Sequence, residues 1–179
     1  MVFTLLAEGF EEIEALAVVD ILRRSEIDVC TVSLGKTAQV TGAHGIIVTA
    51  DFVIDQIDDN YDLLFLPGGY PGYVNMEENT KAIELIKTAH RENKLIAAIC
   101  AAPSILGKLG ILNGKDACCF PGFEKCLTGA NVLFEKVCTS GNVITSRGAG
   151  TSHELGFKIV ELFKGKDVAA SLRTAMLYE

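Results

Sequence analysis

The stretch that decides the fold is Leu95-Ile96-Ala97-Ala98-Ile99-Cys100-Ala101-Ala102-Pro103. Its five apolar residues have the length of a buried strand and end at a cysteine, and the pattern predicts a helix that begins near the proline. Proline suits the first turn of a helix, because the N–H that it lacks has no partner there. The two alanines are small enough for a tight turn. In outline this is a nucleophile elbow, although the G-x-S-x-G sequence of hydrolases is absent.

Cys100 is expected to face the N-terminal end of this helix. The positive end of a helix favours thiolate over thiol, and the thiolate is the reactive form. The position would therefore activate Cys100 and also expose it to oxidation. The alternative is that Cys100 is one more small buried hydrophobic residue, and the strand–cysteine–helix pattern leaves both interpretations open.

The rest of the chain alternates between apolar runs of strand length and helical patterns. Continuous apolar strands separated by helices indicate a mainly parallel sheet that is covered on both faces. We therefore expect an α/β protein, a three-layer α/β/α sandwich, as a single domain over residues 1–179. The expected strands are 2–7, 28–34, 62–66, 95–99, 115–120, 131–139 and 142–145; the expected helices are 11–25, 77–93, 103–109, 151–163 and 167–176; a small hairpin is expected within 39–51.

Composition and charge exclude several classes of protein. The chain has 179 residues, of which 49% are hydrophobic and 22% charged, which excludes disordered and collagen-like chains. A net charge of −7 argues against a nucleic-acid partner. The apolar residues 2–7 follow no basic segment, so we do not expect them to form a signal peptide. Residues 95–112 are interrupted by polar residues and are short for a membrane span, so we expect a cytoplasmic protein with no membrane partner.

Six cysteines and three histidines are present. In the cytoplasm the cysteines should be free thiols. Cys118 and Cys119 are adjacent and no C-x-x-C pair occurs, so we expect no metal site.

Sites in such folds lie at the carboxyl ends of the strands, which directs attention to the loops 8–14, 67–70 and 100–103. Gly68 and Gly69 would let the backbone approach a ligand closely, and an N–H there, together with that of Ala101, could hold developing negative charge. Alternatively, Pro67-Gly68-Gly69 only ends a strand.

A glutamate at the start of the first helix could meet Cys100. Periodicity does not choose among Glu11, Glu12 and Glu14. The alternative for most of them, and for Glu8, is a solvated first turn that the helix dipole favours.

Four segments occur in one order: Glu8-Gly9-Phe10-Glu11-Glu12-Ile13-Glu14, Leu66-Pro67-Gly68-Gly69, Ala97-Ala98-Ile99-Cys100-Ala101-Ala102-Pro103 and Thr145-Ser146-Arg147-Gly148-Ala149-Gly150-Thr151-Ser152. Together they resemble the ThiJ/PfpI superfamily, most closely its DJ-one branch, over nearly the whole chain. The resemblance implies a flavodoxin-like sandwich, usually a homodimer, and no cofactor.

The resemblance also implies roles for particular residues. Glu14 would be protonated and would hydrogen-bond the sulfur of Cys100, and a carboxyl near a buried thiolate would have a raised pKa. The backbone N–H groups of Gly69 and Ala101 would be the oxyanion donors.

Four further positions match the surroundings of that pair in the family. Gly68, Phe120 and Ala149 would line the pocket. His44 would supply a basic group that reaches the site of the partner subunit.

Two departures from the family pattern bear on the reaction. The protease and amidase branches carry histidine directly after the cysteine, where this chain has Ala101, which weakens the case for a cysteine amidase or protease. Phe120-Pro121-Gly122 occupies the region where some relatives carry a pocket histidine. His153 is the remaining candidate for a Cys–His pair, against a solvated helix residue. Structural roles are expected for the other cysteines, which are Cys30, Cys118, Cys119, Cys126 and Cys138.

The resemblance therefore favours a glyoxalase or deglycase that acts on small reactive carbonyl compounds, methylglyoxal-like α-oxoaldehydes or their early adducts. The alternative is a non-catalytic, redox-responsive stress protein or chaperone, in which Cys100 senses oxidation.

Overall fold

The central sheet has seven strands in the order β10-β11-β7-β6-β1-β2-β5, in a computed structural model that describes residues 1–178. Every neighbouring pair is parallel except β10 and β11, so the mainly parallel sheet is confirmed. Glu179, the last residue of the domain expected from the sequence, lies outside the described residues. The strands are β1 Val2–Leu6, β2 Val29–Ser33, β5 Phe52–Val53, β6 Leu63–Leu66, β7 Leu95–Ile99, β10 Val137–Ser140 and β11 Val143–Ser146.

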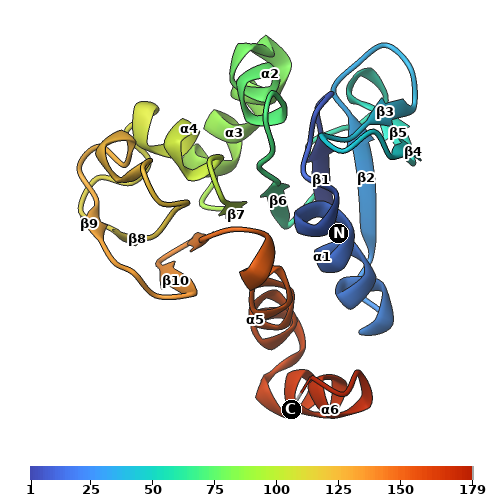
Figure 1. Ribbon diagram of the computed structural model, residues 1–179, viewed down its shortest axis with the longest axis vertical. Helices are drawn as coiled ribbons and strands as arrows, with labels where there is room; N and C mark the ends of the chain where they lie inside the picture. The colour runs from blue at the N-terminus through green and yellow to red at the C-terminus, as the bar shows by residue number, and fades with distance from the viewer. Residues whose placement is uncertain (179) are drawn as a thin grey trace.

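Helices cover both faces of this sheet (Figure 1). Leu63 and Phe65 pack with α1, α5 and α6, whereas Leu64 and Leu66 pack with α2, α3 and α4. Successive side chains of a strand point to opposite faces, so the alternation along β6 gives each helical layer its own core. The expected three-layer sandwich is confirmed. The helices are α1 Glu12–Arg24, α2 Gly72–Glu78, α3 Thr80–Arg91, α4 Pro103–Lys108, α5 Ser152–Lys164 and α6 Lys166–Ala175.

Two small sheets and three short helices complete the fold. The strands β3 (Gln39–Thr41) and β4 (Ile47–Thr49) are antiparallel, which confirms the hairpin expected within 39–51. The second small sheet pairs β8 (Asp116–Ala117) with β9 (Asn131–Val132) in parallel. The 3-10 helices are η1 Ile54–Gln56, η2 Glu124–Cys126 and η3 Ala149–Thr151.

Two of the expected elements are divided in the structure, and one is shorter. The helix expected over 77–93 is two helices that meet at Asn79, whose side chain accepts from Ala82 N–H at 3.0 Å and donates to Leu34 O at 3.0 Å. The amide side chain therefore starts a new helix and ties it to the residue that follows β2. The strand expected over 131–139 is β9 and β10, and only two residues of 115–120 are strand. The edge strand β5 was not predicted.

The order of strands reverses between β1 and β6, because the chain leaves β1 for β2 on one side and returns to β6 on the other. Ligands in open α/β sheets bind at such a reversal, beyond the carboxyl ends of the strands. Glu14, Gly68 and Cys100 follow β1, β6 and β7 in the chain. Among the described residues, every helix falls short of the length and apolar character that crossing a membrane requires.

Candidate active site

Cys100 lies at a sharp turn between β7 and α4. Its φ is +65°, in the left-handed region that a non-glycine residue adopts at a cost of about 1–3 kcal/mol. Two backbone hydrogen bonds fix this conformation: Cys100 N–H donates to Ser146 O at 3.0 Å, and Phe120 N–H donates to Cys100 O at 2.8 Å. The expected nucleophile elbow is present. Hydrogen bonds to β11 and to Phe120 hold Cys100 in this strained backbone conformation.

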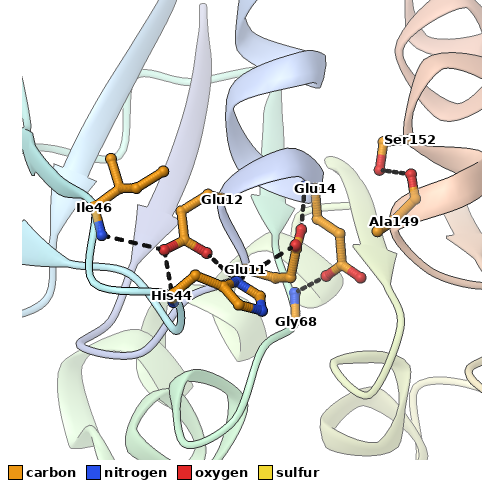
Figure 2. Close-up of polar contacts among 8 residues, drawn as sticks. All are labelled: Glu11, Glu12, Glu14, His44, Ile46, Gly68, Ala149 and Ser152. Carbon is orange, nitrogen blue, oxygen red and sulfur yellow. Dashed lines mark hydrogen bonds and ion pairs between the residues drawn. The ribbon is translucent and has the colours of Figure 1, made fainter.

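Glu14 is the glutamate of the first helix that meets Cys100. Glu14 is 1% exposed and its side chain hydrogen-bonds the thiol of Cys100. Its Oε2 accepts from Gly68 N–H at 2.9 Å (Figure 2). Sequence periodicity left Glu11, Glu12 and Glu14 open; the structure chooses Glu14, because the other two side chains bind the backbone of α1 and His44.

Glu11 fixes the position of Glu14. It is the N-cap of α1, and its Oε2 accepts from Glu14 N–H at 2.6 Å. Its own N–H donates to Gly68 O at 3.0 Å. The start of α1 is therefore joined to the loop after β6 by two hydrogen bonds that run in opposite directions, one through Glu11 and one through Glu14.

Gly68 and Gly69 allow this contact because they have no side chains. A Cβ on Gly68 would lie 2.6 Å from Cys100 Cβ and 2.7 Å from Glu14 Oε2. Gly69 has φ +95°, and a Cβ there would lie 2.3 Å from Glu11 N. A side chain at either position would therefore displace the glutamate from the thiol.

The two titratable groups influence each other. Burial raises the pKa of Glu14 to about 7, and the charge of Glu11 adds to the rise. Burial also raises the pKa of Cys100 to about 12, and the Glu14 carboxylate adds to it, whereas the N–H groups of Ala101 and Gly69 lower it. Burial therefore outweighs the neighbouring N–H groups in setting the direction of the Cys100 pKa.

The raised pKa values of Glu14 and Cys100 are compatible when the two groups share one proton. When Glu14 carries the proton, the carboxylate charge that raises the pKa of Cys100 is gone, and the carboxyl can donate to the sulfur. The backbone N–H groups of Gly69 and Ala101 hydrogen-bond the sulfur. They are thus placed to stabilise negative charge on the sulfur or on an atom bonded to it.

Glu12 and His44 form a separate pair beside this site (Figure 2). His44 Nδ1 lies 2.8 Å from Glu12 Oε2, and His44 N–H donates to Glu12 Oε1 at 2.7 Å. Glu12 is therefore buried and bonded, not solvated, and its hydrogen bond raises the pKa of His44. Within this chain His44 binds Glu12 and does not contact the sulfur of Cys100.

Glu11, Glu12 and His44 are also the described side chains that could hold a metal ion. One ligand atom of each lies within 4.8 Å of the others. His44 and Glu12 already satisfy each other by hydrogen bonding, and Glu11 caps α1, so the geometry does not require an ion.

Phe120 and Ala149 line a groove of about 420 Å³ beside the elbow. A Cβ on Gly148, in the same groove, would lie 3.3 Å from Phe120 Cδ2 and 3.9 Å from Glu14 Oε1. The groove therefore adjoins the Glu14 carboxyl. Sequence reasoning did not assign Phe134 or Arg147, which also line it; Arg147 lies in a quoted motif, but nothing in the sequence marks Phe134.

The remaining histidine and cysteine candidates lie elsewhere. His153 stacks on Tyr178 with ring centroids 5.2 Å apart, so it does not supply a Cys–His pair in this structure. Among the described residues every cysteine is a free thiol. Cys118, Cys119 and Cys138 are buried, in keeping with structural roles.

The chain is similar to known proteins in both sequence and structure. The model of the DJ-1/PfpI family matches residues 1–162. "Protein DJ-1 homolog B" of Arabidopsis thaliana is 37% identical over 174 residues, which cover 96% of this chain and 40% of that protein. The chain likewise spans 44% of "Protein DJ-1 homolog A" of the same plant, so it covers less than half of either protein.

Two further relatives match over most of their own length. "Glutathione-independent glyoxalase DJR-1.2" of Caenorhabditis elegans is 34% identical over 167 residues, covering 92% of this chain and 89% of that protein. The solved structure called "Toxoplasma gondii DJ-1, oxidized" has a TM-score of 0.94 and 32% identity, and covers 98% of this chain and 97% of that one.

Proposed function

The chain belongs to the DJ-1/PfpI family, and from this membership and the thiol site we propose that it is a cysteine-dependent glyoxalase or deglycase. Its substrates are methylglyoxal-like α-oxoaldehydes or the early adducts that they form on proteins, and it acts in the cytoplasm in protection against carbonyl stress. The observation that carries the proposal is the buried Glu14 carboxyl, with a pKa of about 7, hydrogen-bonded to the Cys100 thiol. A relative is named a glutathione-independent glyoxalase.

The first step is the addition of the thiol to the aldehyde. As the sulfur of Cys100 bonds to the aldehyde carbon, its proton passes to Glu14, and the C=O electron pair becomes an oxyanion. The N–H groups of Gly69 and Ala101 stabilise this charge, and the proton returns from Glu14 to the oxygen. The product is a hemithioacetal, and Glu14 is again ionised.

The second step moves a hydrogen between the two carbons. Glu14 takes the proton from the former aldehyde carbon, which gives an enediolate, and then delivers it to the neighbouring carbon. The hydroxyl proton on the former aldehyde carbon passes to the oxygen of the neighbouring carbon, which gives a thioester of a 2-hydroxy acid. Water hydrolyses this thioester and restores the thiol. The net reaction adds one water to the α-oxoaldehyde and needs no redox cofactor and no amine leaving group. A pKa near neutrality suits a group that must both accept and donate a proton.

A homodimer is part of this proposal. Ile13, Ile46 and Ile47 are 55%, 54% and 63% exposed. They lie at the start of α1 and in the β3–β4 hairpin, which the bond from Ile46 N–H to Glu12 ties together. Exposed apolar side chains gathered in one place mark an interaction surface, and a second copy of the chain would cover this one.

The test of the activity is lactate formation from methylglyoxal by the purified protein, without added glutathione. Lactate formation that depends on Cys100 supports the proposal. Lactate formation that is equal in Cys100→Ala, or no formation at all, contradicts it.

A second candidate is a non-catalytic sensor of oxidation, and the oxidised structure of a relative favours it. In this role Cys100 reacts with peroxide to give a sulfenic or sulfinic acid and water, beside the N–H groups of Gly69 and Ala101. Peptide mass spectrometry after mild peroxide treatment tests this role. If Cys100 is oxidised no faster than Cys30, which is also half-buried, the sensor role has no basis.

A further inference from the structure

The groove beside Glu14 is larger than the methyl group of methylglyoxal alone would fill. Its volume of about 420 Å³ falls in the range of small-molecule sites, roughly 300–1,000 Å³. It is lined by Phe120, Pro121 and Phe134, by the segment 148–151, and by Lys136 and Arg147.

Both phenylalanine rings are exposed to solvent. Phe134 is 69% exposed and Phe120 47% exposed. Covering such rings with an apolar group removes their surface from water and is favourable in proportion to the area buried. Two aromatic walls favour a flat occupant, because aromatic rings attract one another in stacked or edge-to-face arrangements.

Arg147 holds one of these walls in place. Its guanidinium lies 5.6 Å from the centre of the Phe134 ring, and Nη1 donates to Phe134 O at 3.4 Å. A cation over a ring face attracts the ring. Phe134 is therefore fixed from one side, and the groove lies along it.

Two residues that line the groove lie next to the reacting groups. Phe120 N–H is bonded to Cys100 O at 2.8 Å. On the other side, Gly148 is close enough to Glu14 that a Cβ on it would lie 3.9 Å from Oε1. A substrate whose aldehyde carbon is at the sulfur can thus extend its substituent past Glu14 into the groove.

We propose that the groove between Phe120 and Phe134 binds the substituent of the α-oxoaldehyde, and that the preferred substituent is a planar apolar group such as a phenyl ring. This inference rests on the proposed function, because it names the substrate class of the same site. Phe134 is then a residue that determines specificity, since it contacts the substituent and not the reacting atoms.

The experiment compares phenylglyoxal with methylglyoxal as substrates. The measured quantity is the ratio of kcat/KM for phenylglyoxal to kcat/KM for methylglyoxal, so that the intrinsic reactivity of each aldehyde cancels between variants. We expect Phe134→Ala to lower this ratio about tenfold, Phe134→Leu to lower it less, and the control Phe52→Ala to leave it unchanged. Phe52 is 40% exposed but lies on the edge strand β5, outside the groove. An unchanged ratio in Phe134→Ala overturns the inference.

A binding measurement separates this inference from the proposed function. The products of the two reactions would be mandelate and lactate, and calorimetry measures the binding of each to the unmodified protein. Tighter binding of mandelate that Phe134→Ala abolishes supports the subsite even if neither aldehyde is turned over, in which case only the proposed function fails. Equal binding of the two acids contradicts the subsite even if both aldehydes react.

Sedimentation of the same variants tests the other occupant of an apolar groove, a second copy of the chain. We expect Phe134→Ala to keep the oligomeric state of the unmodified protein. A lower state in Phe134→Ala assigns the groove to an interface and overturns the inference.

Discussion

Glu14 Oε2 accepts a hydrogen bond from Gly68 N–H at 2.9 Å, and this bond joins the first helix to the loop that ends β6. The same carboxyl hydrogen-bonds Cys100 at the end of β7. Three segments from different parts of the chain thus meet at one carboxyl group. The geometry depends on the absence of a side chain at Gly68.

Gly68→Ala should strongly lower activity without unfolding the protein. The added methyl would lie 2.6 Å from Cys100 Cβ and 2.7 Å from Glu14 Oε2, so it must push the two groups apart. We expect a loss of about 100-fold or more in kcat/KM for methylglyoxal, because small displacements of reacting groups are costly. The control is Gly35→Ala, whose methyl would make an ordinary contact 3.5 Å from Ser33 Oγ. Full activity in Gly68→Ala would show that the contact is not needed.

The pH dependence of activity should follow the shared proton. Below the Glu14 pKa of about 7, both the carboxyl and the thiol carry protons, and no base accepts the thiol proton. We expect kcat/KM for methylglyoxal to rise about tenfold per pH unit up to neutrality and then to level off. A profile that is flat between pH 5.5 and 9, measured in buffers of constant ionic strength, would exclude Glu14 as the proton carrier.

Glu14 should also make stability depend on pH. Its pKa rises from 4.5 to about 7 on folding, so its contribution to stability is fully present below pH 4.5 and is lost as pH rises through 7. The gap corresponds to roughly 3 kcal/mol. Urea unfolding at pH 5 and pH 8 measures this loss, and Glu14→Gln should remove much of it. Glu78→Gln, at an exposed carboxyl, is the control and should leave the loss unchanged; an equal loss in Glu14→Gln and the unmodified protein would contradict the account.

The proposed dimer predicts a specific effect of charge at the exposed isoleucines. Ile47→Asp should give a folded monomer, because the new carboxylate would be buried without a partner in the interface. Leu162→Asp, at a 43% exposed apolar residue of α5, is the matched control and should stay dimeric. Sedimentation velocity distinguishes the two states. A dimer of unchanged affinity in Ile47→Asp would place the interface elsewhere.

The buried strands and the elbow could be predicted from the sequence, and the choice among the glutamates could not. Apolar runs such as 62–66 and 95–99 indicate buried strands. A cysteine between such a run and Pro103 indicates a tight turn from strand to helix. Glu11, Glu12 and Glu14 occupy the same first turn, and only tertiary contacts distinguish them: one caps α1, one binds His44, and one meets Gly68 and Cys100.

Other features depended on contacts between distant segments. The division of the helix at Asn79 follows from its hydrogen bond to Leu34 O on another element. The pKa of Cys100 is raised by burial and by Glu14. The local sequence around the cysteine shows neither cause. Phe134 lies in a loop with no motif, and its place in the groove comes from the packing of Arg147 against it.

The most direct test of the central claim is lactate formation from methylglyoxal by three purified proteins without glutathione, followed by proton NMR. Cys30 and Cys100 are both half-buried free thiols, so Cys30→Ala controls for the loss of a thiol in general. We predict that the unmodified protein and Cys30→Ala form lactate at the same rate and that Cys100→Ala forms none above the uncatalysed background. Lactate formation by Cys100→Ala at the rate of the unmodified protein would contradict the account.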